Sequence, residues 1–150
     1  GRLHWDLPQS LYLDEIHDAL VELKAGNEIF LPIYNRRLCE RTGRMLFTPA
    51  PVVFVEGLQL FADPRIRKLL DLRLWLEIDE ETALVRRLKR QPDYDVAYHR
   101  AVALPAQREH VLPLRVCAHG IIDGAQSVKV VAETADEIIR RFFGIHDTMA

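Results

Sequence analysis

The chain has 150 residues, of which 49% are hydrophobic and 28% are charged, a composition typical of one globular domain with a real core. Its formal net charge of −2 offers no general attraction to nucleic acid or to an anionic membrane. No apolar run approaches the ~20 residues that span a bilayer, so we expect neither nucleic acid nor membrane as a partner.

The two cysteines, Cys39 and Cys117, form no CxxC pattern and indicate neither a disulfide framework nor a structural zinc site. Reduced cysteines and the lack of a visible signal peptide fit a cytoplasmic protein. The chain begins with Gly1 rather than Met, which is consistent with a processed or truncated product.

The first predicted element is a helix that ends at Gly26, with Ser10 as its candidate N-cap. Residues 28–48 then predict a β-hairpin, with arms at 29–31 and 45–47 and a bend near Thr42-Gly43. The hairpin carries Arg36, Arg37, Arg41 and Arg44 beside Tyr34. A solvated face and a binding site explain this basic tip equally well.

Residues Val52–Val55 form a short β-branched and aromatic run, which predicts a strand buried on both faces. Glu56-Gly57 follows it directly, so the carboxylate would lie at the carboxyl edge of a parallel sheet, where open α/β folds bind ligands. A second strand is predicted at 72–78, after a helix that Pro64 begins. We expect the two strands to be parallel neighbours.

The remaining chain alternates helices with strands. Asp79 is a candidate cap for a helix at 80–90, and a further helix from about residue 93 to 115 contains Pro105. Residues 120–123 and 128–131 are strand candidates, and Thr134 with Glu137 predicts the start of a last helix that ends at Gly144. The pattern predicts a single α/β domain over 1–150, with a mostly parallel sheet, flanking helices and an added β-hairpin.

Several segments resemble, in the same order, the motifs of the uridine kinase-like branch of P-loop kinases, which includes phosphoribulokinase. Trp5-Asp6-Leu7-Pro8 resembles the F-D-H-P segment of that family, and Pro32-Ile33-Tyr34-Asn35 resembles its P-V-Y-D. The run from Pro51 to Gly57 is similar to its Walker-B-type strand, and Asp63-Pro64-Arg65-Ile66-Arg67 is similar to its D-P-x-x-R. Residues 79–90 resemble its mobile lid. The likeness covers nearly the whole chain.

The sequence departs from this family in three places. It contains no glycine-rich loop ending in Gly-Lys-Ser/Thr, the motif that cradles phosphates, and the family's catalytic aspartate would precede Gly1. Cys39 takes the place of a base-contacting histidine, and the lid is shorter. The chain therefore resembles the C-terminal part of a P-loop kinase fold, N-terminally truncated, and pyrimidine specificity does not follow.

The resemblance implies ATP and Mg²⁺ as cofactors, and it assigns roles to three arginines and to one glutamate. Arg86 and Arg90, one helical turn apart, would act as catalytic residues that neutralise charge on the triphosphate, and Arg87 would contact the nucleotide. Glu56 would hold Mg²⁺ through bound waters. A solvated basic helix paired with Glu80 and Glu81 is the alternative for these arginines.

On the acceptor side, the resemblance places Asp6 at the vicinal hydroxyls of a nucleoside-like substrate, since a carboxylate accepts two donors at once. Tyr34, Cys39 and Arg41 would complete that substrate-binding pocket, converging with Asp6 near Glu56. A helix cap for Asp6 and a hairpin aromatic for Tyr34 are the structural alternatives.

These assignments predict ATP-dependent phosphoryl transfer to a hydroxyl of a nucleoside, uridine-like or related. The 150 residues are expected to be inactive alone, without the phosphate cradle. The rival hypothesis is a non-catalytic binding or oligomerisation module of kinase-like fold, and it leaves a homo-oligomer open.

Overall fold

The computed structural model describes residues 7–35 and 37–145 and divides into two compact units. The helix–hairpin unit is Pro8–Leu69, and the sheet unit consists of residue 7 and residues 70–145. Among the described residues, no helix has both the length and the apolar character that crossing a membrane requires.

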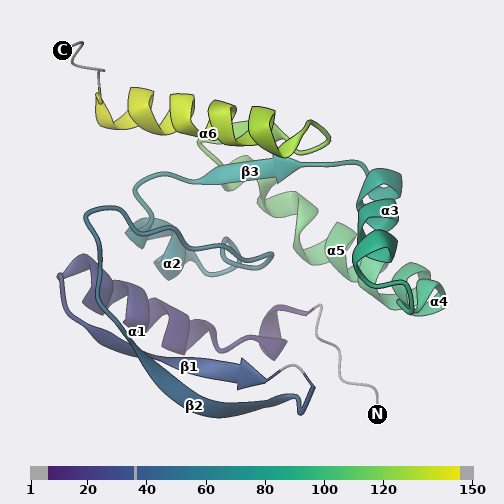
Figure 1. Cartoon of the computed structure of the whole chain (residues 1–150), viewed down its shortest axis with the longest axis horizontal. Helices are drawn as coiled ribbons and strands as arrows, with labels where there is room; N and C mark the ends of the chain where they lie inside the picture. Colours follow the sequence, from purple (N-terminus) through teal and green to yellow (C-terminus); the bar gives the residue numbers. More distant parts are fainter. Residues whose placement is uncertain (1–6, 36, 146–150) are drawn as a thin grey trace. The chain divides into compact units, whose positions relative to one another are not determined.

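The helix–hairpin unit places one long helix beside an antiparallel hairpin (Figure 1). Its core is small, with Leu20 and Ile66 buried from the two helices and Leu60 from the intervening loop. The elements are the 3₁₀ turn η1 (Pro8–Ser10), α1 (Leu13–Lys24), β1 (Ile29–Asn35), β2 (Glu40–Phe47) and α2 (Pro64–Leu69).

Helix α1 begins at Leu13, two residues later than a Ser10 cap would place it. The N-cap is Tyr12, which makes no side-chain capping bond, and Ser10 belongs to η1, so the predicted cap is wrong. The C-terminal prediction is confirmed, because Gly26 adopts φ +81°, a left-handed conformation that favours glycine. Lys24 of the last turn donates a hydrogen bond to the Leu69 carbonyl at 2.8 Å.

The hairpin pairs as its apolar arms predict. Phe30 lies opposite Leu46, and Leu31 opposite Met45. The bend, however, lies beyond Asn35 rather than near Thr42-Gly43, and Gly43 is a strand residue opposite Ile33. The Asn35 side-chain oxygen accepts the backbone N–H groups of Arg37 and Leu38 at 3.0 and 3.1 Å, a local turn that overrides the glycine signal.

The predicted strand at Val52–Val55 is wrong. These residues form no ladder, and the exposed fraction of Phe54 is 78%. A parallel strand is stable only where neighbouring strands satisfy its backbone and helices cover its faces. Within the described residues, no strand pairs with this run.

The sheet unit contains a parallel pair, β3 (Leu74–Glu77) and β4 (Gly120–Asp123), in register from Leu74 with Gly120 to Glu77 with Asp123. The partner of β3 is therefore β4, not residues 52–55 as expected. The other elements are α3 (Glu80–Arg90), α4 (Val96–Tyr98), the π-helical turn η2 (His99–Ala103), α5 (Leu104–His110), the 3₁₀ helix η3 (Leu112–Cys117) and α6 (Val128–Phe143).

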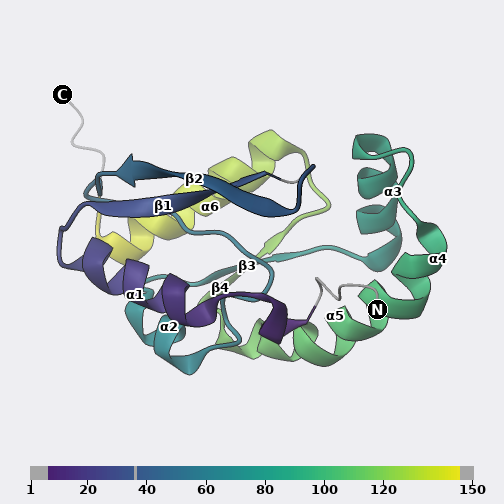
Figure 2. The ribbon, with the colours of Figure 1, turned by 90° about the horizontal axis from the view of Figure 1, so that it is seen from below.

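Helices make the crossover that a parallel pair requires. Asp79 caps α3, because its carboxylate accepts the Thr82 N–H at 2.8 Å, as the sequence predicts. Figure 2 shows α4 and α5 as one curved run. Pro105 has no N–H to offer the preceding turn, and the π-helical turn η2 accommodates it within that run.

Helix α6 begins seven residues earlier than a Thr134 cap predicts, so the strand at 128–131 and the capping box are both wrong. The Ser127 hydroxyl accepts the Val130 N–H at 3.3 Å and caps the helix. The half-buried positions 131, 134, 135, 138 and 139 follow helical spacing, so Thr134 lies on the packed face. This amphipathic pattern outweighs the strand propensity of the valines.

With the parallel pair β3–β4, its flanking helices and the added hairpin, the predicted α/β class is confirmed. Gly120 permits close packing of α6 on the sheet, because a Cβ atom there would lie 3.2 Å from Leu74 Cδ2 and 3.6 Å from Ile138 Cδ1. Ile122, at 2% exposed, is the best-buried residue of the pair.

We predict that Gly124→Ala lowers the free energy of unfolding by about 1–3 kcal/mol. A Cβ at Gly124 would lie 3.0 Å from the Glu77 carbonyl oxygen, which accepts the Gly124 N–H at 2.7 Å. Urea unfolding followed by circular dichroism measures the effect. Gly43→Ala is the matched control, since its Cβ would meet only Ile33 Cδ1 at 3.7 Å. Equal losses in both variants would contradict the prediction.

Candidate functional site

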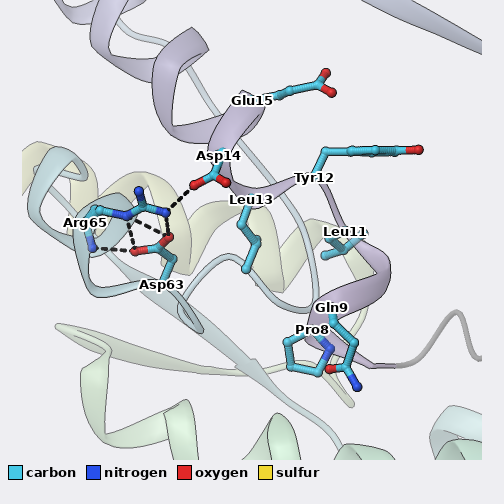
Figure 3. A pocket seen from close by; sticks show the side chains of 9 residues that line it. All are labelled: Pro8, Gln9, Leu11, Tyr12, Leu13, Asp14, Glu15, Asp63 and Arg65. Atoms are coloured by element: carbon cyan, nitrogen blue, oxygen red, sulfur yellow. Dashed lines mark hydrogen bonds and ion pairs between the residues drawn. The ribbon is translucent and has the colours of Figure 1, made fainter.

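An open hollow of about 620 Å³ lies in the helix–hairpin unit, around the start of α1 (Figure 3). Apolar side chains and four charged groups line it together. The apolar part comes from the segment before and into α1, and the charged part comes from the first turn of α1 and the start of α2. The lining residues are Pro8, Gln9, Leu11, Tyr12, Leu13, Asp14, Glu15, Asp63 and Arg65.

Arg65 ties two of these carboxylates together. Its guanidinium contacts Asp63 Oδ2 and Asp14 Oδ1, each at 2.6 Å, and its backbone N–H donates to Asp63 Oδ1 at 2.7 Å. The Asp63 side chain is 8% exposed, whereas that of Asp14 is 84% exposed. The hydrogen bonds from Arg65 lower the pKa of Asp63 to about 2, so this carboxylate stays ionised and occupied.

A second charged group lies where the hairpin meets α1. Arg41 Nη1 lies 2.8 Å from Glu15 Oε2, and the Arg41 guanidinium carbon lies 4.2 Å from the centre of the Tyr12 ring. Figure 3 shows Tyr12 and Glu15 pointing away from Arg65. The hollow therefore has two sides. Arg65 with Asp63 and Asp14 lies on one side, and Tyr12 and Glu15, which contact Arg41, lie on the other.

Tyr34 lies opposite Arg41 in the hairpin register and is 47% exposed. Desolvation raises the pKa of the Tyr34 hydroxyl, and the neighbouring Cys39 thiol, which is hydrogen-bonded to it, raises it further. Tyr12 adds a smaller electrostatic effect in the same direction. The hydroxyl is thus a hydrogen-bond donor at neutral pH, near an aromatic residue that lines the hollow.

Cys39 occupies a strained position of the turn. Its φ of +53° is in the left-handed region, which a non-glycine residue rarely adopts, and its side chain is exposed. Three of the four predicted substrate-binding residues, Tyr34, Cys39 and Arg41, thus lie together at the hairpin tip. The fourth, Asp6, lies outside the described residues, so its convergence with them stays a prediction.

The structure brings Glu56 to none of these groups. Glu56 is exposed, lies in a segment without regular structure and is absent from the lining of the hollow. No group of three or more His, Cys, Asp or Glu side chains among residues 7–35 and 37–145 could hold a metal ion. A single carboxylate that holds Mg²⁺ through bound waters does not require such a group, so the assignment of Glu56 stays a prediction.

Two of the three lid arginines already have partners in the sheet unit. Arg86 donates to the carbonyls of Gly124 and Ala125 at 2.5 and 2.9 Å, and Arg87 lies 4.7 Å from the centre of the Tyr94 ring. Arg90 is exposed in the last turn of α3. Glu80, the alternative partner considered for these arginines, binds Arg108 of α5 instead, at 2.7 Å.

The sequence-based assignment missed most of the hollow. Arg65 and Asp63 belong to a motif that carries the family resemblance, yet that resemblance assigned them no role. Tyr12 and Glu15 gave no signal beyond helix-start chemistry. Their proximity to Arg41 depends on how α1 lies along the hairpin, which no spacing in the sequence encodes.

Comparison with known proteins places the chain in a family. The sequence model of the phosphoribulokinase / uridine kinase family matches residues 2–99, about two thirds of the chain. The chain therefore belongs to this family of P-loop kinases, and the predicted family is confirmed.

Individual relatives agree with this assignment. The chain is 28% identical over 155 residues to a probable uridine-cytidine kinase of Caenorhabditis elegans, an alignment covering 94% of this chain and 61% of the relative. It is 31% identical over 90 residues to a uridine kinase of Streptococcus equi subsp. zooepidemicus, covering 59% of this chain and 43% of the relative. A uridine kinase of Borreliella burgdorferi is 30% identical over 93 residues, with 60% and 44% covered. The chain thus spans about half the length of these curated relatives.

We predict that the stability of the helix–hairpin unit falls as the pH decreases from about 4 to about 2. The pKa of Asp63 is lowered in the folded state to about 2, so its contribution is complete above the unfolded pKa and is lost as pH falls through the folded pKa. Thermal unfolding between pH 2 and pH 6 measures this dependence. Asp63→Asn should reduce the decrease in melting temperature at acid pH. Asp18→Asn, which changes a side chain that is 81% exposed, should leave that decrease unchanged. The same pH dependence of the melting temperature in Asp63→Asn as in the wild type would contradict this role of Asp63.

Proposed function

We propose that this chain carries the acceptor side of a kinase that transfers the γ-phosphoryl group of ATP to a hydroxyl of a nucleoside-like small molecule. The observation that carries the proposal is the meeting of Tyr34, Arg41, Tyr12 and Glu15 beside the hollow, in a chain of the phosphoribulokinase / uridine kinase family. Relatives named as uridine kinases support a nucleoside as the acceptor.

The hollow suits a polar ring-bearing ligand. Its lining combines apolar side chains with an aromatic face at Tyr12 and exposed carboxylate oxygens at Asp14 and Glu15. Small-molecule sites generally have such a largely apolar wall with a few polar groups that fix orientation. Asp63 is already satisfied by Arg65, and Glu15 is held by Arg41, so the free acceptor capacity for ligand hydroxyls lies at Asp14, whose side chain is 84% exposed.

The chain supplies fewer residues for binding the nucleotide than for binding the acceptor. Bound Mg²⁺ would neutralise charge on the phosphates during transfer. The chain contributes Arg90, which is exposed on α3, and Glu56, which is exposed in its loop. Arg86 and Arg87 would have to exchange their present partners to contact a nucleotide. Phosphoryl transfer also requires a glycine-rich phosphate loop, which these 150 residues do not contain.

A binding or oligomerisation module is the second candidate, and exposed apolar surface favours it. Phe30 and Leu46 pair on the hairpin with 67% and 51% of their surfaces exposed, and Phe54 is 78% exposed. Apolar surface of this kind marks interaction sites in many proteins. A gene segment ending in Gly-Lys-Ser/Thr about 60–70 residues before Asp6 would favour the kinase. A gene without that segment would favour the module.

We predict little or no binding of Mg-ATP to the 150-residue chain alone, because the phosphate cradle supplies most nucleotide contacts in P-loop kinases. Isothermal titration calorimetry should give no measurable isotherm at micromolar protein. A micromolar dissociation constant, about −8 kcal/mol, would show that an unrecognised site replaces the cradle.

We predict that Asp6→Asn in the full-length protein lowers kcat/KM for the acceptor and leaves the KM for ATP nearly unchanged. The decrease in kcat/KM should correspond to a loss of about 1.5–3 kcal/mol of transition-state stabilisation. The reason is the loss of one charge-assisted hydrogen bond to a ligand hydroxyl. Steady-state kinetics with a nucleoside panel measures both constants, and Asp18→Asn is the control. Unchanged acceptor kinetics with slightly lower stability would identify Asp6 as a helix-capping residue and favour the module.

A further inference from the structure

Polar and aromatic side chains connect the hairpin to the start of α1. Three apolar residues of the hairpin, Phe30, Met45 and Leu46, are each more than half exposed. At the base, Thr48 donates to Glu28 at 2.5 Å, a bond within the segments that flank the two strands. At the tip, Arg41 of β2 contacts Glu15 of α1 and Tyr12, the residue that precedes the helix.

We propose that Arg41, Tyr12 and Glu15 form a clasp that holds the hairpin tip against α1 and thereby positions Tyr34 beside the hollow. In this proposal Arg41 is a positioning residue and makes no contact with the acceptor itself. The effect on the acceptor rests on the function proposed above, whereas the effect on the hairpin does not.

The geometry supports indirect action by Arg41. One guanidinium nitrogen lies within hydrogen-bond distance of both Glu15 carboxylate oxygens, at 3.1 and 2.8 Å, and the guanidinium also covers the Tyr12 ring at 4.2 Å. A planar guanidinium suits this combination of carboxylate and aromatic face, and a lysine ammonium does not. Arg41 is absent from the lining of the hollow, while both of its partners belong to that lining.

Strand pairing connects the position of Arg41 to the position of Tyr34. Tyr34 and Arg41 are cross-strand partners, and a register shift between Ile33 and Tyr34 separates this last part of the ladder from the rest. Holding Arg41 on α1 therefore fixes the part of β1 that carries Tyr34. The electrostatic effect of Tyr12 on Tyr34 agrees with this proximity.

The clasp is weak enough to open. The side chains of Arg41 and Glu15 are 39% and 53% exposed, so water competes for both charges. An exposed ion pair and an exposed cation–π contact together shift an open–closed equilibrium by on the order of tenfold. Such a bias is sufficient to order the tip and small enough for an entering ligand to overcome.

A charge swap tests the clasp in this chain without any ligand. Spin labels at Cys39 and at Asp18→Cys, in a Cys117→Ser background, report the separation of the hairpin tip from α1 by double electron–electron resonance. Arg41→Glu and Glu15→Arg alone should each broaden the distance distribution, and the double variant should narrow it again. Arg44→Glu is the matched control, because Arg44 lies on the same strand opposite Pro32 and should leave the distribution unchanged. Broadening that persists in the double variant, or that appears equally in Arg44→Glu, would overturn the clasp.

Kinetics of the full-length protein test the consequence for the acceptor. Each single charge reversal should raise the acceptor KM by about tenfold with kcat and the KM for ATP within about twofold, and the double variant should recover most of the loss. A double variant as impaired as Arg41→Glu would show direct contact with the acceptor and overturn the positioning role. Wild-type protein that phosphorylates no nucleoside would refute the proposed function, and the spin-label result would still decide the clasp.

Discussion

The bidentate hold of Arg65 on Asp63 is the interaction on which the helix–hairpin unit depends most. Asp63 is nearly buried, and a buried carboxylate is tolerated only when a charge and hydrogen bonds compensate it. The same guanidinium reaches Asp14, 51 residues earlier in the chain, and so connects the first turn of α1 to the start of α2. One arginine thereby brings together the two chain segments whose side chains surround the hollow.

Around this fixed point the unit is unevenly stabilised. The side facing α2 is supported by Arg65 and by the fully buried Ile66, whereas the hairpin side depends on exposed contacts of Arg41. A rigid side beside a weakly held side is a common arrangement in sites that must admit a ligand and then surround it. The charges follow the same division, since the satisfied carboxylate lies on the rigid side and the more exposed ones lie nearer the opening.

Much of the local structure was predictable because local signals and packing agree. The hairpin arms, the Asp79 cap, the helix that Pro64 begins and the end of α6 at Gly144 all follow from patterns within a few residues. The family was predictable for a different reason, since the order of its motifs survives at low identity.

The failures share a cause in non-local context. Val52–Val55 has the composition of a buried strand, but a strand needs partners, and composition cannot report whether they are present. The same limit applies to Arg86, whose position on a basic helix says nothing of the carbonyls that it binds at the end of β4. The side chains that surround the hollow come from segments separated by tens of residues, and their meeting depends on packing that the residue pattern does not describe.

The π-helical turn before Pro105 has a consequence for the evolution of this segment. Such a turn contains one residue more than a regular helical turn and accommodates it locally. Deleting one residue among 99–103 would therefore return this turn to regular α-helical geometry, with Arg108 still facing Glu80 and Ala106 still buried. A deletion within the regular part of α5 would instead rotate every later side chain by about 100° around the helix axis. Natural length variation in this family is expected to occur at these five positions and in the turn at 91–95, and to avoid the rest of α5.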